Sequence, residues 1–381
     1  MKSSNSEQLK DNRGKINIVK AEAFATPMPF IKPFTMAKGT ITHSENVCIR
    51  LEDQEGRVGW GECYNVPVIY GRGYKEIHQA LTTYLLPAIV GIDPLEIGKI
   101  NYILDGALPG SLDAKSGIDM AVYDLLGKQL EVPVYKLLGG KHTDTIPVIA
   151  ESPIAPPEEV VEMARKDIEK GHKYYKLKLG GNWKEDIERV RAVREAVGDS
   201  IIIKGDANAN YTRDTALKVI SALENVNMQY FEQPLKQYDF AGCAWLAERV
   251  NTPISADEDV QTVHDAFKVI SMQSASNIVI KLLKHGGLYR SSQIASMCET
   301  VGVPISVSSG TETSLGRAAL LHFYAANPSS VGAMEIAEML SDDLVDENER
   351  IYVKPTLKVP EGHGLGVNVN EQKIEQYKVQ I

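Results

Sequence analysis

The spacing of hydrophobic and polar positions divides the chain into two regions of different periodicity. In the first region, short alternating runs predict an antiparallel sheet, and helical spacing follows them. The turn Asp53-Gln-Glu-Gly56 between two such runs is typical of a hairpin. The strand-like runs are 16–25, 46–51 and 58–62, and the helical ones are 74–84, 93–104 and 111–130. These patterns predict an α+β domain over residues 15–135, preceded by a loosely ordered stretch at residues 1–14.

From Thr145 onward, strand-like and amphipathic helical segments alternate with a repeat of roughly 25 to 30 residues. The expected strands are 146–150, 174–179, 201–205, 230–231, 254–256, 278–281, 305–308 and 332–336. Eight βα repeats are the number that closes into a TIM-type (β/α) barrel. An open doubly wound sheet is the competing architecture, but no glycine-rich phosphate fingerprint follows the first strand. We therefore predict an α/β fold with a barrel over residues 136–350 and a β-like segment over 351–381 that returns to the first domain.

Composition and charge limit the kinds of molecule that this protein is expected to bind. The 381 residues carry a net charge of −9 with a pI near 5.5, which argues against a nucleic acid or an anionic membrane as partner. The four cysteines show no metal-binding or disulfide spacing, so reduced thiols are expected. No apolar run approaches a membrane span, and the N-terminus lacks the apolar core of a signal peptide. We therefore expect a cytoplasmic protein.

Two loops of the first region carry apolar and aromatic residues. They span Pro27 to Thr40 and Cys63 to Gly73, and the second contains Tyr70, a candidate substrate contact. Such loops suit lids over a small-molecule site and equally suit contact with a neighbouring subunit. We expect a homo-oligomer.

Ionisable residues recur where successive barrel strands are expected to end. From Lys178 they follow at spacings of 28, 26, 25 and 24 residues, one βα unit each. Catalytic groups of such barrels gather at the C-terminal ends of the strands, so these side chains should share one mouth. The series consists of Lys176 and Lys178, then Asp206, Glu232, Asp257 and finally Lys281, and Asn208 and Glu258 follow two of the acids as candidate supporting residues.

Three carboxylates at one mouth would repel one another unless a cation lay among them. Hard oxygen ligands on rigid strands fit Mg²⁺ best, with Mn²⁺ as a substitute, and no His or Cys ligands for zinc are present at these positions. A single acidic residue at a strand end is ordinarily a helix N-cap. Three in succession, with lysines on both sides, instead indicate a metal site.

The lysines suggest removal of a proton next to a carboxylate. Lys176 and Lys178 lie on one face of their strand, so Lys176, together with the metal, should lower the pKa of Lys178. A lysine base must be neutral, which requires its pKa to fall by about 3 units from ~10.4, worth about 4 kcal/mol. Lys281 stands on the opposite wall. One lysine could therefore abstract the α-proton of a metal-bound carboxylate and the other could return it, through an ene-diolate.

These motifs resemble those of the enolase superfamily, and within it the muconate lactonizing enzyme subgroup. The resemblance covers nearly the whole chain. It is carried by Leu-Leu-Gly-Gly140, Lys-Leu-Lys178, Asp-Ala-Asn208, Glu-Gln-Pro234, Ala-Asp-Glu258 and Lys281 with Gly-Gly287. The resemblance implies an α+β capping domain on a modified TIM barrel. It also implies Asp206, Glu232 and Asp257 as ligands of Mg²⁺, with Lys178 and Lys281 as the acid/base pair.

The subgroup includes cycloisomerases, racemases, epimerases and dehydratases, so the resemblance leaves the reaction open. The eighth strand reads Ala333-Met-Glu-Ile-Ala-Glu338, without the Asp-x-Asp by which dipeptide epimerases hold an ammonium group. Glu335 could bind a cationic nitrogen or form a salt bridge, and Glu312 resembles a residue of cycloisomerases. Asp259 and Lys204 have no assigned role.

Our first hypothesis is a Mg²⁺-dependent racemase or epimerase acting α to a small-molecule carboxylate, such as an amino-acid or proline derivative. Both lysines are required for that reaction. A cycloisomerase or syn-dehydratase, which needs only one lysine, is the alternative. A non-catalytic binding protein with the same fold is the hypothesis from another class, and the intact set of ionisable residues argues against it.

Overall fold

The first part of the chain folds as an antiparallel sheet covered by helices. The computed structural model describes residues 16–36, 39–67 and 71–381, so the predictions for residues 1–14 and for Tyr70 lie outside the described residues. The strands are β1 (Ile18–Ala25), β4 (Val47–Asp53) and β5 (Val58–Cys63), in the order β1-β4-β5. The hairpin between β4 and β5 turns through Gly56, whose φ of 78° suits glycine and whose amide donates to the Asp53 carbonyl.

The helices of this region are α2 (Tyr74–Ala80), the π-helical turn η1 (Leu81–Leu85), α3 (Leu86–Ile89), α4 (Ile97–Ala107), α5 (Leu112–Gln129) and α6 (Val134–Leu137). Helix α5 lies against β5 so closely that the backbones touch. A Cβ on Gly61 would lie 2.0 Å from the carbonyl oxygen of Gly117, and one on Gly59 would lie 2.4 Å from that of Ala121. The two glycines of β5 therefore set the distance between sheet and helix.

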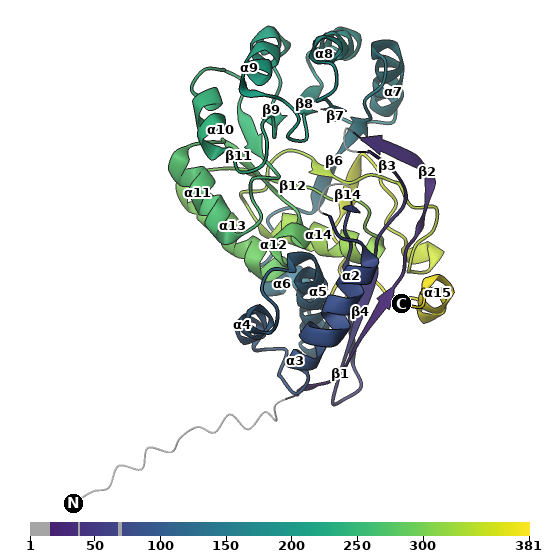
Figure 1. Cartoon of the computed structure of the whole chain (residues 1–381). Coiled ribbons are helices and arrows are strands. Elements are labelled where there is room, and N and C mark those ends of the chain that lie inside the picture. The colour runs from purple at the N-terminus through teal and green to yellow at the C-terminus, as the bar shows by residue number, and fades with distance from the viewer. Residues whose placement is uncertain (1–15, 37–38, 68–70) are drawn as a thin grey trace, which may run out of the picture.

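The loop expected between Pro27 and Thr40 contains a hairpin, which corrects the prediction. Strand β2 (Pro29–Met36) pairs with β3 (Gly39–His43) in antiparallel fashion. The two strands extend from the cap toward the barrel (Figure 1). There, the amide of Ile31 donates to the carbonyl of Met339. The hairpin thus lies beside the chain that leaves the last barrel strand.

The second part of the chain is a nearly closed parallel barrel of eight strands within the described residues, as predicted. Its strands are β6 (Thr145–Ser152), β7 (Tyr174–Lys178), β8 (Ile202–Asp206), β9 (Tyr230–Glu232), β10 (Ile254–Ala256), β11 (Asn277–Ile280), β12 (Ile305–Val307) and β13 (Met334–Glu335). Strand β13 pairs with β6, and only isolated bridges, Ile305 to Ser330 and Ser308 to Glu335, join the β12 side to the β13 side in the described chain. Helices cover the outside of the barrel (Figure 1).

The helices of the barrel are α7 (Pro157–Glu169), α8 (Trp183–Val197), α9 (Arg213–Ala222), the 3₁₀ turn η2 (Glu224–Val226), α10 (Phe240–Ala247), α11 (Val263–Met272), α12 (Leu282–His285), α13 (Leu288–Val301) and α14 (Ser314–Ala326). Short, fully buried strands such as β9 and β10 explain why the sequence reads there as apolar runs without alternation. Within the described residues, no helix combines the length and the hydrophobicity that a membrane crossing requires.

Glu62 of β5 connects the cap to the barrel. Its buried carboxylate accepts hydrogen bonds from the Thr313 hydroxyl at 2.8 Å and the Gly316 amide at 2.9 Å, at the N-terminus of α14. A carboxylate is favoured at that end of a helix. The cap is thereby attached directly after the seventh-strand loop, residues 308–312.

The C-terminal segment is not β-like over its length, contrary to the prediction. It forms the 3₁₀ turn η3 (Glu347–Glu349), the short strand β14 (Thr356–Lys358) and helix α15 (Glu371–Tyr377). Strand β14 pairs with β6 of the barrel, and the Val379 amide donates to Ala25 of the cap. Helix α15 begins at Asn370, whose side chain caps the amides of Gln372 and Lys373.

Candidate active site

The register of the barrel strands brings the expected ionisable residues to one level. Lys178 is paired with Asp206 across β7 and β8, and Asp206 with Glu232 across β8 and β9. Asp257 directly follows β10, and Lys281 directly follows β11. Strands β7 and β11 are four places apart in the barrel order, so Lys178 and Lys281 stand on facing walls.

Lys176 lies at the centre of a buried ionic network. Its ammonium nitrogen is 2.9 Å from both carboxylate oxygens of Glu232, 2.7 Å from Glu335 and 3.2 Å from Asp206. Lys178 contacts the same Asp206 at 2.8 Å from the other side. The two lysines predicted to share a face therefore share a carboxylate as well.

Two lysines also hold Asp257. Lys281 reaches its Oδ2 at 2.6 Å, and Lys284 reaches its Oδ1 and its backbone carbonyl, each at 2.6 Å. Lys284 was missed by the sequence reasoning. A signal was present, because Lys284 follows Lys281 by one helical turn in Lys-Leu-Leu-Lys, and this places both ammonium groups on the same side.

The carboxylates differ in pKa because their lysine neighbours differ. Burial raises the pKa of each, but Lys176 and Lys178 bring the pKa of Asp206 well below its ordinary range, and Lys281 and Lys284 do the same for Asp257. For Glu232, burial together with the negative charges of Asp206 and Glu335 outweighs Lys176, so its pKa lies well above the ordinary range. Negative charge is therefore incompletely compensated at Glu232.

The expected fall in the pKa of Lys178 is not what this arrangement gives. Burial and the neighbouring Lys176 both lower the pKa of Lys178, but the negative charges of Asp206, Glu151 and Glu232 together outweigh them, and the net direction is upward. The pKa of Lys176 is raised well above its ordinary value by Asp206, Glu232 and Glu335, against the effect of burial. The expected fall in the pKa of Lys178 depends on a bound cation as well as on Lys176, and it stays a prediction.

The fit of a divalent cation can be judged from the donor set. Asp206, Glu232 and Asp257 are each 98% or more buried, since their exposed fractions are 1%, 2% and 1%. Carboxylate oxygens without His or Cys suit Mg²⁺, and the excess of negative charge at Glu232 suits any cation. In the described chain, no three such side chains are already gathered around one point, because lysines hold them. The donor chemistry fits Mg²⁺, and the ligand assignment stays a prediction.

A pocket opens above this network, with an empty volume of about 800 Å³ that includes its opening to solvent. Lys176, Lys178, Lys281 and Asn208 line its floor. The cap contributes apolar groups, and the barrel contributes the seventh-strand loop and the chain after β13. The remaining lining residues are Phe34, Ile41, Tyr64, Val66, Ile149, Glu151, Ser308, Ser309, Gly310, Thr311, Glu335, Ile336, Ala337 and Met339.

Glu258 and Glu312 lie near this pocket without lining it. Glu258 accepts a hydrogen bond from Asn208, and burial together with Asp257 and Asp206 raises its pKa to about 7. Glu312 accepts hydrogen bonds from the Ser309 hydroxyl and the Gly310 amide, and burial raises its pKa. Glu312 thus shapes the seventh-strand loop.

Glu335 forms the salt bridge that the sequence left as one of two alternatives. It accepts from Lys176 at 2.7 Å and from the Ser308 hydroxyl at 3.0 Å, and Lys204 lies 3.8 Å away. Lys204 is buried beside Tyr230, and burial lowers its pKa. Asp259 accepts a hydrogen bond from the Tyr238 amide at 2.5 Å, which indicates a structural role.

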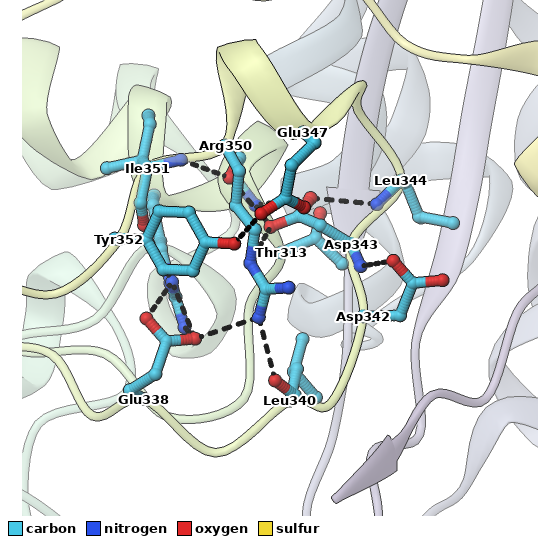
Figure 2. Close-up of polar contacts among 12 residues, drawn as sticks. Thr313, Glu338, Leu340, Asp342, Asp343, Leu344, Glu347, Arg350, Ile351 and Tyr352 are labelled. Atoms are coloured by element: carbon cyan, nitrogen blue, oxygen red, sulfur yellow. Dashed lines mark hydrogen bonds and ion pairs between the residues drawn. The ribbon is translucent and has the colours of Figure 1, made fainter. Parts of the chain in front are cut away.

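The chain that follows β13 is fixed by arginines. Figure 2 shows Arg350 reaching both Glu338 and the carbonyl of Leu340, at 3.2 and 2.9 Å. Arg317 of α14 donates to Glu338 as well. Because Ala337 and Met339 line the pocket, these ion pairs hold its wall in place.

Glu151 is an ionisable lining residue that was not predicted from the sequence. It lies on β6 opposite Lys176 and is 3.9 Å from Lys178. A signal was present, because Ala-Glu-Ser152 ends the apolar run of the first barrel strand with an ionisable residue, as in the later strands.

Comparison with known proteins finds matches over most of the chain. Residues 19–139 match the model for the mandelate racemase/muconate lactonizing enzyme N-terminal domain, and residues 159–373 match the model for the enolase C-terminal domain-like family. N-succinyl-L-Arg/Lys racemase of Bacillus cereus is 30% identical over 365 residues, 96% of this chain and 98% of the relative. A crystal structure of that racemase covers the same shares with a TM-score of 0.91.

Two further relatives represent other reactions. Hydrophobic dipeptide epimerase of Enterococcus faecalis is 33% identical over 348 residues, 90% of this chain and 97% of the relative. A dipeptide epimerase structure from that organism, complexed with Mg and L-Leu-L-Tyr, is 32% identical with a TM-score of 0.86, covering 93% of this chain and 99% of its own. Muconate cycloisomerase 1 of Rhodococcus opacus is 29% identical over 368 residues, 95% of this chain and 98% of the relative.

These relatives are racemases, epimerases and cycloisomerases, and all are isomerases. The predicted enzyme class and the predicted fold, a capping domain on a modified TIM barrel, are therefore confirmed. The chain belongs to the mandelate racemase/muconate lactonizing enzyme family of the enolase superfamily.

Proposed function

We propose that the protein is a Mg²⁺-dependent racemase or epimerase that removes and returns the α-proton of a carboxylate substrate. The observation that carries this proposal is the pair of lysines, Lys178 and Lys281, that line one pocket from facing barrel walls. Reaction at both faces of a carbon requires a proton donor and acceptor on each side. The named activities of the relatives, on N-succinyl-Arg/Lys and on dipeptides, support an amino-acid derivative as substrate.

In this proposal Asp206, Glu232 and Asp257 hold the cation, as the Mg-containing structure of a relative suggests. When bound, Mg²⁺ supplies the positive charge that stabilises an ene-diolate. Lys178 and Lys281 accept and return the proton. Lys176 keeps Asp206 and Glu232 in position through the contacts described above. The apolar cap residues Phe34 and Ile41 exclude water from the reacting carbon.

The test is a pair of single variants, Lys178→Ala and Lys281→Ala, with Lys166→Ala on the exposed face of α7 as control. Each pocket variant should abolish racemisation, because one face loses its only proton carrier, while the fold measured by circular dichroism stays intact. In D₂O each should still exchange the α-proton of one enantiomer only. Full racemisation by either pocket variant would rule out the two-lysine scheme.

A cycloisomerase or syn-dehydratase is the second candidate, and the likeness to muconate cycloisomerase favours it. That reaction uses a single lysine. Wash-out of the α-hydrogen with inversion supports the racemase, and ring closure or loss of a leaving group supports the alternative. A cytoplasmic location, a homo-oligomeric state and Mn²⁺ as a substitute for Mg²⁺ stay predictions from the sequence.

A further inference from the structure

Glu151 occupies a place in the pocket that the proposed reaction does not use. It stands near the end of β6, in register with Lys176, and its side chain remains 23% exposed. Its Oε2 lies 3.9 Å from the Lys178 ammonium nitrogen, beyond hydrogen-bond distance. The carboxylate therefore borders the space next to the proposed base and forms only a long ion pair with it.

The charged side chains that line the pocket differ in whether they can contact a ligand. Among the described lining residues, the basic ones are Lys176, Lys178 and Lys281, and each already contacts a carboxylate. Glu335 also lines the pocket, but Lys176 and Ser308 hold its Oε2, and its Oε1 is buried. Glu151 is thus the acidic lining group with substantial exposure to the pocket.

The rest of the wall offers no second site for a negative charge. Phe34, Ile41, Val66, Ile336 and Met339 present apolar surface, and the seventh-strand loop presents hydroxyl groups. A carboxylate placed there would be desolvated without a cationic partner among the described residues, which is costly. A cationic nitrogen beside Glu151 would instead form a charge-assisted contact, an ion pair that needs no N–H donor.

We propose that Glu151 is a specificity-determining residue that selects carboxylate substrates bearing a positively charged nitrogen on the α-carbon, over analogues with a second carboxylate. This inference rests on the proposed function, because the substrate carbon must lie about 3 to 3.5 Å from Lys178 for proton transfer. The α-nitrogen, one bond away, then falls within reach of Glu151. A free or N-alkylated amino acid fits this description, whereas an N-succinyl amino acid or a muconate does not.

The experiment compares ligands that share a skeleton and differ in the charge on nitrogen. For leucine and for proline, the N-methylated betaine, the N-acetyl and the N-succinyl derivatives are offered to the Mg²⁺-loaded full-length protein. Exchange of the α-proton in D₂O is followed by NMR, and binding by the shift in Tm. The betaines should exchange with a kcat/KM about tenfold or more above the N-succinyl compounds, the factor expected of one charge-assisted contact.

Variants then assign the preference to Glu151. Glu151→Gln should raise KM for the betaines about tenfold with little change in kcat, and Glu151→Asp should restore part of the loss. Glu162→Gln, which removes one exposed charge on α7, is the matched control and should change nothing. A preference for the N-succinyl compounds, or an equal loss of kcat for all ligands in Glu151→Gln, would overturn the inference.

Binding separates this inference from the proposed function. If the betaines bind selectively and Glu151→Gln removes that selectivity, but no α-proton exchanges, the assignment of Glu151 stands and the racemase proposal fails. If N-succinyl compounds exchange faster than betaines, the racemase proposal stands and the role of Glu151 is refuted. Absence of any binding preference among the ligands refutes it as well.

Discussion

At the scale of single residues, Asp257 shows how much of the site depends on lysines outside the reaction. Lys284 is 2% exposed and holds Oδ1 and the backbone carbonyl of Asp257. Without Lys284, Lys281 still holds Oδ2 of Asp257, but the buried Oδ1 and backbone carbonyl lose their donor, and an unsatisfied buried acceptor costs about 1 to 3 kcal/mol. We therefore expect Lys284→Met, measured by urea unfolding in EDTA, to lower the free energy of unfolding by a few kcal/mol.

Added Mg²⁺ should stabilise the Lys284→Met variant more than the wild type. The missing ammonium group no longer competes with a cation for Oδ1 of Asp257, and binding to the folded state raises its stability. Lys268→Met on the outer helix α11 serves as control. Equal unfolding of variant and wild type in EDTA would contradict this account of Asp257.

The residues of the site were predictable where spacing along the chain carries the information. Lys178, Asp206, Glu232, Asp257 and Lys281 recur once per βα unit, and the register places them at one level. Pairing between side chains was not predictable, because it depends on which lysine reaches which carboxylate. For the same reason the ion pair of Lys178 with Asp206, which raises the pKa of the lysine, was not predictable from the spacing.

At the scale of elements, the close contact between β5 and α5 depends on Gly59 and Gly61 of β5, which have no side chain. We expect Gly61→Ala to lower the free energy of unfolding by about 3 kcal/mol or more, because its Cβ would meet a backbone carbonyl that cannot move alone. Denaturant unfolding measures the effect. Gly106→Ala in α4, where a Cβ meets nothing within 4 Å, is the control and should be neutral or stabilising. Equal stabilities of the two variants would contradict the close packing.

The hairpin β2–β3 was missed for a reason that also lies at this scale. Pro29 and Pro33 lack the amide hydrogen that a strand interior uses, so the segment reads as a loop. Its pairing is irregular between Pro29 and Phe34, which accommodates the second proline. The C-terminal helix α15 was missed because its seven residues are too few for helical periodicity to stand out.

At the scale of the whole molecule, His322 joins three parts of the chain. Its Nδ1 accepts from the Tyr135 amide at 3.2 Å, so the ring is neutral there, and its Nε2 donates to the Leu365 carbonyl at 3.1 Å. Burial lowers the pKa of His322 from 6.5 to about 4. Below pH 6.5, His322 therefore binds a proton in the unfolded chain but stays neutral in the folded chain. The free energy of unfolding consequently falls as the pH falls from 6.5 toward 4.

We expect His322→Gln to remove this part of the pH dependence, which amounts to about 3 kcal/mol for a shift of this size. The measurement is the free energy of unfolding of both proteins at pH 7.5 and pH 5, with His264→Gln as an exposed control. The difference between wild type and variant should shrink on acidification. A constant difference across this range would show that His322 is not held neutral.

The architecture as a whole was predictable because eight apolar runs at regular spacing are compatible with few folds other than a barrel. The way the barrel closes was not, since it depends on pairings between residues far apart in sequence. Strand β13 contains two residues, and isolated bridges join its side of the described barrel to β12, whereas β7 and β8 pair over five positions.

Amide hydrogens along the β12–β13 seam should consequently exchange with deuterium earlier than those of β7 and β8, as mass spectrometry of peptic fragments can establish. Lys178 stands on the side of the barrel expected to exchange slowly, and the pocket-lining residues Ser308 and Glu335 stand at the seam. The two lysines of the proposed reaction thus differ in the mobility of their surroundings, since Lys281 follows β11, the neighbour of β12 at the seam, while Lys178 belongs to a strand paired over five positions.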